Sequence, residues 1–359
     1  MADRSLQEFV QEVNGESHLR VEHDYGDGFV RLRTSEAERR QAAQDIQCSE
    51  NIVLELLRNS RDAHATHVFL AVSREGEKRR ITVIDDGDGI PPAMHEHVFE
   101  PRVTSKLDTS HMDAWGLHGR GMALFSIAVN AESAQVVDSN TGLGCSIAVQ
   151  TDTQKLSEKA DQSGFPRFEL TAEGTVNVRG PRNILRTACE FAIESRDSCA
   201  VYVGSPAEVA STILAYGNST LSAIDKAFCR DASQLPLVKR LATCADPDDL
   251  AQMAESIGLE VSERTARRIL DGQIPEAESL IDRIVLTKPA DSKKPAKKGR
   301  SGNRSKLKLT REDVARLSQA ASAGFAEIAG EYYLEEGVEP RVRVARDALT
   351  ITIPLVEKP

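Results

Sequence analysis

The chain has 359 residues, a net charge of −10 and ordinary proportions of hydrophobic (40%) and charged (28%) side chains. This length predicts two or three domains, and the acidic balance excludes a protein that binds nucleic acid over its whole surface. No apolar run approaches a membrane span or a secretory signal, so we expect a cytoplasmic location and no membrane partner. The six cysteines lack C-x-x-C spacing, which predicts scattered thiols rather than a metal site.

Five segments follow one another along the chain. Residues 1–34 carry short alternating, strand-like runs, and residues 35–181 mix helical with strand patterns. Residues 182–286 show amphipathic helical periodicity, which predicts a helical domain. A linker rich in Lys, Pro, Gly and Ser follows at 287–308, and residues 309–359 predict one helix and two strands. The fold class is therefore α/β (α+β), with a helical domain and a small C-terminal α/β segment.

Polar side chains form one stripe on an apolar helix that is predicted from Ser49 onward. Glu55, Asn59 and Asp62 stand at i, i+4 and i+7, which places them on one helical face. Polar groups on a buried helix are costly without partners. An amide oxygen can ligate a hard cation, and a carboxylate can accept a proton from a nearby water. The stripe thus indicates either a divalent-cation site or a solvated helix face.

A short strand, residues 81–84, runs directly into the sequence Asp-Asp-Gly-Asp-Gly-Ile-Pro at 85–91. Its two glycines, Gly87 and Gly89, permit close backbone approaches that other residues forbid. Asp85, at the end of the strand, is placed rigidly enough to accept a hydrogen bond from the amino group of a base. The alternative is a plain Asp-Gly turn, and the spacing disfavours a calcium loop.

Three glycines, Gly116, Gly119 and Gly121, precede a helix that is predicted at 122–130. Backbone N–H groups and the positive end of the dipole at a helix N-terminus bind anions. The segment lacks the Gly-Lys-Ser/Thr of a P-loop, and its glycine order differs from the dinucleotide fingerprint. It therefore predicts a phosphate-binding loop of another kind.

In this order, the three segments resemble the conserved boxes of the GHKL ATPases, which include DNA gyrase, the ninety-kilodalton heat-shock chaperones, histidine kinases, MutL and topoisomerase VI. Residues 55–63 are similar to the first box, 85–91 to the second, 116–121 to the third, and Gly174-Thr175 to the fourth. The resemblance covers roughly residues 45–180. It implies a Bergerat fold, a two-layer α/β sandwich with helices on one face of a mixed sheet and the nucleotide between them.

The resemblance also implies ATP and Mg²⁺ as ligands and assigns roles to single residues. Glu55 corresponds to the general base that activates the attacking water, Asn59 to the Mg²⁺ ligand, and Asp85 to the acceptor of the adenine amino group. Residues 92–118 correspond to a lid over the nucleotide. The implied ATP-binding positions are Asn59, Asp62, Asp85, Gly87, Gly89, Ile90, Lys106, Gly116, Gly119, Arg120, Gly121, Met122 and Thr175.

The second box departs from the gyrase-like pattern at one position. An Arg stands between the two glycines in gyrase-like members, where this chain has Asp88. The acidic partner of that Arg is also absent, because the matching position is Ala63. Both members of the pair are lost together, so we expect nucleotide binding to survive.

The flanking regions favour one branch of the family. Residues 1–48 lack the phosphoacceptor helix pair of histidine kinases, and the chain has no room for the later domains of the chaperones. The pair Ser105-Lys106 is similar to the lids of MutL and topoisomerase VI, and residues 206–271 loosely resemble the helix–two-turns–helix domain of topoisomerase VI B subunits. The resemblance implies an ATP-gated homodimeric clamp with an N-terminal strap (1–34). It would act on DNA with a separate DNA-cleaving partner, and 309–359 would be a reduced transducer.

Two other functions stay open. Lys288, Lys306 and Lys308 are candidates for the lysine that reaches the γ-phosphate, but no motif selects one. Without it, the protein would be a nucleotide-dependent dimerising sensor with little hydrolysis. A histidine or serine protein kinase-like function is the third alternative, which Glu55 disfavours. Eight Lys and Arg residues at 293–308 either contact DNA phosphates or form a solubilising tether.

Overall fold

The computed structural model describes residues 21–105, 111–113, 116–118, 121–170, 176–222, 224, 226, 229, 231–287, 311–329, 337–338, 340–344 and 349–354. The chain divides into two compact units, Met1–Ala290 and Asp291–Pro359. The first unit holds the three predicted boxes, and the second holds the C-terminal helix and strands. Each unit is described by itself below.

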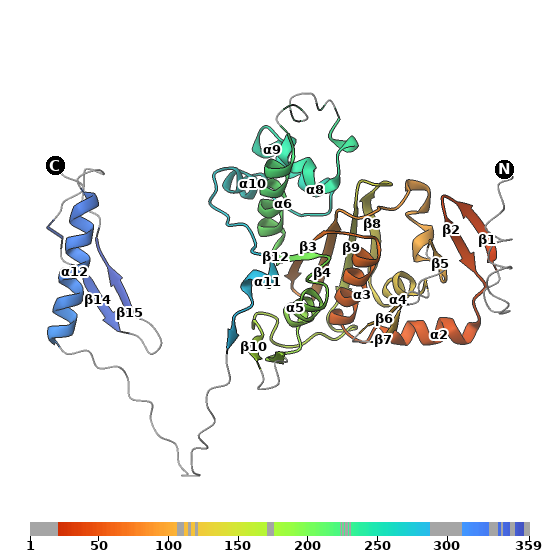
Figure 1. Ribbon diagram of the computed structural model, residues 1–359, viewed down its shortest axis with the longest axis horizontal. Coiled ribbons are helices and arrows are strands. Elements are labelled where there is room, and N and C mark those ends of the chain that lie inside the picture. Colours follow the sequence, from red (N-terminus) through yellow and green to blue (C-terminus); the bar gives the residue numbers. More distant parts are fainter. Residues whose placement is uncertain are drawn as a thin grey trace, which may run out of the picture. The chain divides into compact units, whose positions relative to one another are not determined.

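The first unit is built on a five-stranded sheet with the order β12-β3-β4-β9-β8 (Figure 1). Its strands are β3 (His67–Glu75), β4 (Lys78–Asp85), β8 (Ser133–Ser139), β9 (Cys145–Asp152) and β12 (Ala200–Gly204). All neighbours are antiparallel except β12 and β3, which are parallel. The mixed sheet confirms the predicted α/β fold class.

Both faces of this sheet are covered, because the central strands are apolar on both sides. Val68 and Leu70 of β3 belong to one hydrophobic core, while Phe69 and Ala71 belong to another. Side chains alternate between the faces of a strand, so a continuous apolar run marks a strand that is buried on both.

Among the described residues, the first face is covered by α3 (Ser49–Asp62), α4 (Ala123–Asn130), α5 (Ile184–Glu194) and the short helix α11 (Leu280–Arg283). Helix α2 (Glu36–Asp45) packs against α4. Helix α3 buries Ile52, Leu56 and Leu57 almost completely, as its apolar periodicity predicts. This layer, with the sheet behind it, is the two-layer arrangement that we expected.

The second face carries a further layer of helices (Figure 1). It consists of α6 (Pro206–Thr220), α8 (Leu237–Arg240), the 3-10 turn η4 (Leu241–Thr243), α9 (Pro247–Ser256) and α10 (Glu263–Leu270). Leu237 and Ile213 from this layer share a core with Phe69 and Ile84 of the sheet. Residues 182–286 therefore contain helices, as their periodicity predicts, but α6 and α8–α10 pack directly on the sheet. Part of the helix expected at 220–229 lies outside the described residues.

Strand β12 lies beyond residue 181, where we expected the ATP-binding domain to end. It pairs with β3 in the register Val201↔Val68, and its Tyr202 ring stacks on Phe69 with centroids 5.0 Å apart. The run Ala-Val-Tyr-Val between two helical patterns is short, so periodicity alone did not separate it from its helical surroundings. The sheet thus extends into the segment that we had assigned to the helical domain.

Smaller strands flank the sheet. In the expected strap, β1 (Val21–Gly26) and β2 (Phe29–Leu32) form a hairpin, and β2 pairs with β5 (Val103–Thr104). A second group contains β10 (Arg167–Leu170), β11 (Val176–Arg179) and β13 (Leu286–Thr287), and β6 (His111–Asp113) pairs with β7 (Gly116–His118). Short 3-10 turns, η1 (Pro92–Met94) and η2 (His97–Phe99), precede β5, and η3 (Ala232–Gln234) precedes α8.

The second unit contains α12 (Arg311–Ala329) and the antiparallel pair β14 (Arg341–Val344) and β15 (Leu349–Thr352). The Ser318 hydroxyl donates to the Pro340 carbonyl at 3.1 Å, which ties the helix to the start of β14. The basic residues 293–308 and the three candidate lysines lie outside the described residues. Within the described part of the chain, no helix is long and apolar enough to cross a membrane. All six cysteines are free.

Candidate nucleotide site

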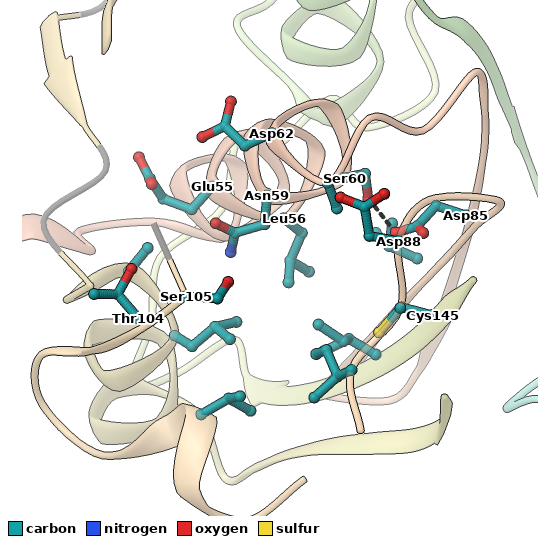
Figure 2. A pocket seen from close by; sticks show the side chains of 18 of the residues that line it. Glu55, Leu56, Asn59, Ser60, Asp62, Asp85, Asp88, Thr104, Ser105 and Cys145 are labelled. Atoms are coloured by element: carbon teal, nitrogen blue, oxygen red, sulfur yellow. Dashed lines mark hydrogen bonds between the residues drawn. The ribbon is translucent and has the colours of Figure 1, made fainter. Parts of the chain in front are cut away.

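A cavity of about 180 Å³ lies between α3, the end of β4, the start of β9 and the first turn of α4. Figure 2 shows it from close by, with side chains from α3 above its open centre. Its lining residues are Phe29, Glu55, Leu56, Asn59, Ser60, Asp62, Ala63, Val83, Asp85, Asp88, Gly89, Ile90, Val98, Val103, Thr104, Ser105, Gly121, Ala123, Leu124, Cys145 and Ile147. Segments far apart in the sequence, the predicted first and second boxes, therefore meet at one cavity.

The polar stripe on α3 lines this cavity, as its spacing predicted. The side chain of Glu55 is 21% exposed, and its Oε1 accepts from Nη1 of Arg58 at 2.6 Å. Asp62 pairs with its neighbour Arg61 at 3.4 Å. The Arg58 side chain is only 7% exposed, so the cation that holds the Glu55 carboxylate is itself fixed in the helix layer.

Asn59 carries an unsatisfied polar atom at the cavity. Its Nδ2 is buried and has no hydrogen-bond partner among the described residues. In Figure 2 its amide extends from α3 toward the centre of the cavity. The two ends of an amide can exchange by rotation about one bond, so the same position can present Oδ1. A buried amide nitrogen without a partner among the described residues indicates a site that a ligand completes.

Asp85 lies at the other end of the cavity and is 5% exposed. Its carboxylate accepts from the Ser60 hydroxyl at 2.7 Å (Figure 2). It also accepts from the Gly87 N–H at 3.0 Å. Burial raises the pKa of Asp85 to about 6, while these two donors act in the opposite direction. Asp85 is thus a desolvated carboxylate that is ionised at neutral pH, and it suits the recognition of a donor group.

The glycines of the second box are required by close packing. A Cβ on Gly87 would lie 2.5 Å from the Ala63 carbonyl oxygen at the end of α3. Gly89 has φ +73°, and a Cβ there would collide with the Asn140 carbonyl. Both positions therefore need glycine, and the second box lies directly between the end of α3 and the loop at 140–144.

The residue between these glycines has a partner after all. Asp88 Oδ2 lies 2.7 Å from His64 Nδ1, next to Ala63, where we expected nothing to pair. The carboxylate of this pair comes from the second box and the imidazole follows the end of α3, so the acidic residue stands on the opposite segment from that of the gyrase-like arrangement. Both side chains are more than half exposed, which limits the contribution of the pair to stability.

Comparison with known proteins agrees with this geometry. Residues 45–155 match the family model described as "Histidine kinase-, DNA gyrase B-, and HSP90-like ATPase". Two similar proteins are named DNA mismatch repair protein MutL. The one from Lactiplantibacillus plantarum is 40% identical over 104 residues, and the one from Aquifex pyrophilus is 38% identical over 105 residues. Residues 45–155 are a GHKL ATPase domain.

These likenesses are confined to the GHKL domain. They cover 28% of this chain in each case, and only 15% and 24% of the two relatives. A solved structure, full-length ShkA in complex with AMPPNP, covers 46% of this chain and 38% of its own at 16% identity, but its TM-score of 0.22 is too low to support an argument. The MutL relatives confirm that branch of the resemblance, and a specific likeness to topoisomerase VI stays a prediction.

Not all predicted positions of the GHKL site can be placed. Gly121 lines the cavity with φ +67°, and its carbonyl accepts from the Arg102 N–H at 2.8 Å. Ile90 also lines it, whereas Gly87, Gly116 and Met122 are not among the described lining residues. Met122 instead caps α4. Lys106, Gly119, Arg120 and Thr175 lie outside the described residues, so their roles stay predictions.

Sequence reasoning missed two kinds of lining residue. The apolar wall comes from Val83 of β4, from its register partner Ile147 on β9, and from Phe29 of the predicted strap. Ser60 and Cys145 flank Asp85, the second as its register partner on β9. Ser60 could have been found, because a buried carboxylate at a strand end needs a donor. Cys145 could not, since the β4–β9 register was unknown, and burial raises the pKa of its thiol well above the usual range.

Proposed function

We propose that the GHKL domain binds Mg²⁺-ATP in this cavity and hydrolyses it, and that the protein works as an ATP-gated dimeric clamp in DNA transactions. One observation carries the proposal. A carboxylate that can act as a general base (Glu55), an amide whose buried Nδ2 has no partner among the described residues (Asn59) and a desolvated carboxylate (Asp85) line a single cavity in a GHKL domain.

At the inner end of the cavity, Asp85 accepts a hydrogen bond from the adenine amino group. Ser60 and the Gly87 N–H hold the carboxylate in place, so that little reorganisation is needed when the base arrives. The neighbouring apolar residues Val83, Ile90 and Ile147 provide surface for the base. A charge-assisted bond to a buried carboxylate discriminates strongly between a donor and an acceptor on the base.

At the end of the cavity away from Asp85, the side chains of α3 fit a hard divalent cation. Asn59 offers an amide whose buried end has no other partner, and amide oxygens are ligands that Mg²⁺ accepts. Within the described residues, no group of three His, Cys, Asp or Glu side chains could hold a metal. Mg²⁺ that is held by one amide and by the phosphates of the substrate suits such a sparse protein donor set, and it neutralises phosphate charge when bound.

Glu55 accepts the proton of the water that attacks the terminal phosphate. It stands one helical turn before Asn59, so both side chains reach the same part of the cavity. Its ion pair with Arg58 fixes the carboxylate before the substrate arrives. The phosphates themselves are bound by the glycine loop at 119–121, and lid residues 92–118 exclude water.

The clamp is proposed on more general grounds. The relatives are named DNA mismatch repair proteins, and the basic run at 293–308 is suited to phosphate contacts in a chain whose net charge is −10. The strap hairpin β1–β2 pairs with β5 next to the cavity, so its exchange between two subunits would respond to the nucleotide. We place the protein in the cytoplasm as a homodimer with a separate DNA-cleaving partner, in a topoisomerase VI B-like arrangement.

Phosphate release by the purified full chain separates the three candidate functions. We expect steady release in Mg²⁺-ATP, its loss on chelation with EDTA, stimulation by double-stranded DNA, and a dimer in the presence of a non-hydrolysable ATP analogue. Tight ATP binding without release would contradict the clamp and favour the dimerising sensor. Transfer of labelled phosphate to a protein would instead indicate a kinase.

A further inference from the structure

The end of β8 and the loop after it, residues 138–144, pack against the second box. The Ile90 N–H donates to Ser139 Oγ at 2.7 Å, and this hydroxyl donates to the Gly144 carbonyl at 2.8 Å. The Gly142 N–H donates to the Asp88 carbonyl at 2.6 Å. Gly89 and Gly144 both need glycine because the two segments touch backbone to backbone. The loop therefore fixes the path of the segment that carries Asp85.

The opposite side of the same loop is held by the second helical layer. The Leu237 N–H, at the start of α8, donates to the Leu143 carbonyl at 2.9 Å. Arg240, at the end of α8, donates from Nη1 to the Asp138 carboxylate. Two anchors from one short helix thus hold both ends of the loop.

The Arg240 side chain is buried and hydrogen-bonded at every nitrogen of its guanidinium group. It is 3% exposed, and besides Asp138 it donates to the Leu235 carbonyl at 3.0 Å and to the Ser233 carbonyl at 3.1 Å. All three guanidinium nitrogens therefore have partners. Leu237 and Val238 of the same helix are buried in the core that contains Ile84, the residue before Asp85. Helix α8 cannot shift without disturbing this core, so the loop is held against a rigid support.

We propose that Arg240 is a positioning residue for the nucleotide, and that through it the helical layer braces the adenine-binding segment. The inference rests on the proposed function, because it assumes that ATP binds with its base at Asp85. It follows that ATP binding and the docking of the helical layer stabilise each other, since coupling between two sites is reciprocal. A change that loosens α8 acts on affinity for the base, and not on the chemical step at α3.

The test measures ATP and ADP binding by the full chain with Arg240→Gln and with Asp138→Asn. We expect each change to weaken the binding of both ATP and ADP about fivefold or more, which is the lower end of common coupling between two sites. The double variant should be no weaker than the stronger single variant, because both remove one contact. The rate at saturating ATP should stay within about twofold, since only ground-state binding is altered.

Arg79→Gln is the matched control. Arg79 is 6% exposed and forms a buried pair with Glu158 at 2.8 Å, on the same strand as Asp85 but near its opposite end. It should lower thermal stability and leave the dissociation constants unchanged. Unaltered ATP affinity in folded Asp138→Asn, whose carboxylate is 33% exposed, would overturn the proposal even if Arg240→Gln fails to fold. A wild-type chain that binds no ATP would instead overturn the proposed function.

Discussion

Glu55→Gln should lose roughly a hundredfold or more in the rate of phosphate release and keep its affinity for ATP, because general-base catalysis contributes about 10²–10⁴ to such rates. Glutamine has the same shape, and its amide oxygen can still accept from Arg58, which holds Oε1 of Glu55 at 2.6 Å. The helix layer should therefore stay intact. Only the ability to take a proton from the attacking water is removed. Single-turnover phosphate release together with equilibrium ATP binding measures the two effects separately.

Glu158→Gln provides the control for this change. Glu158 is also an arginine-paired glutamate, with Arg79 at 2.8 Å and Arg74 at 2.6 Å, but it does not line the cavity. The Glu158→Gln substitution should alter the stability of the fold without altering the rate of phosphate release at saturating ATP. If Glu55→Gln released phosphate at the wild-type rate, the base would have to be sought elsewhere.

Asp85→Asn should weaken ATP binding by about ten- to a hundredfold, which corresponds to the roughly 1.5–3 kcal/mol of a hydrogen bond to a charged group. The ionised carboxylate can only accept hydrogen bonds, and the Ser60 hydroxyl at 2.7 Å and the Gly87 N–H at 3.0 Å use two of its acceptor sites. An amide in its place turns one oxygen into a donor and removes the charge. Calorimetric titration with ATP measures the loss.

The same substitution should stabilise the empty protein. Burial raises the pKa of Asp85 from 3.8 to about 6, so the folded state binds a proton more tightly than the unfolded chain. Ionised Asp85 therefore costs up to about 3 kcal/mol at pH 7, and this cost disappears as the pH falls from 6 to 4. Asp85→Asn should raise the free energy of unfolding at pH 7, and the difference from wild type should vanish near pH 4. Wild-type ATP affinity should fall below about pH 6, where Asp85 becomes protonated.

The adjacent residue gives the opposite result and serves as the control. Hydrogen bonds from His67 and Thr66 outweigh burial and hold the pKa of Asp86 below its usual value. Ionised Asp86 thus contributes stability that is lost as the pH falls through its folded pKa. Asp86→Asn should destabilise the fold at pH 7. Urea unfolding of both variants at pH 7 and pH 4 would contradict the account if the two shifts had the same sign.

Much of this architecture follows from local sequence patterns. The spacing of residues 55, 59 and 62 on α3 predicted one wall of the cavity, because residues at these spacings must share a helical face. The strand ending at Asp85 and the glycines after it fixed another, and the helix after Gly121 begins at Ala123. These features depend on neighbours within a few residues, which a single sequence contains.

The remaining features depend on contacts across long sequence separations. The second helical layer could not be placed, because amphipathic helices show that they have an apolar face but not what covers it. The Asp88–His64 pair and the Arg240–Asp138 contact join residues 24 and 102 positions apart. A charged side chain on a predicted helix gives no sign that it will be buried, so the burial of Arg240 could not be foreseen.

The most direct test of the nucleotide site is the affinity of the unmodified chain for ATP against GTP. Adenine presents an amino donor at the position where guanine presents a carbonyl acceptor, and Asp85 can accept but not donate when it is ionised. We predict that ATP binds roughly a hundredfold or more tightly than GTP at pH 7, because a site that is built to pair with a donor rejects an acceptor strongly. Equal affinity for the two nucleotides would contradict the assignment of Asp85 and, with it, the orientation of ATP in the cavity.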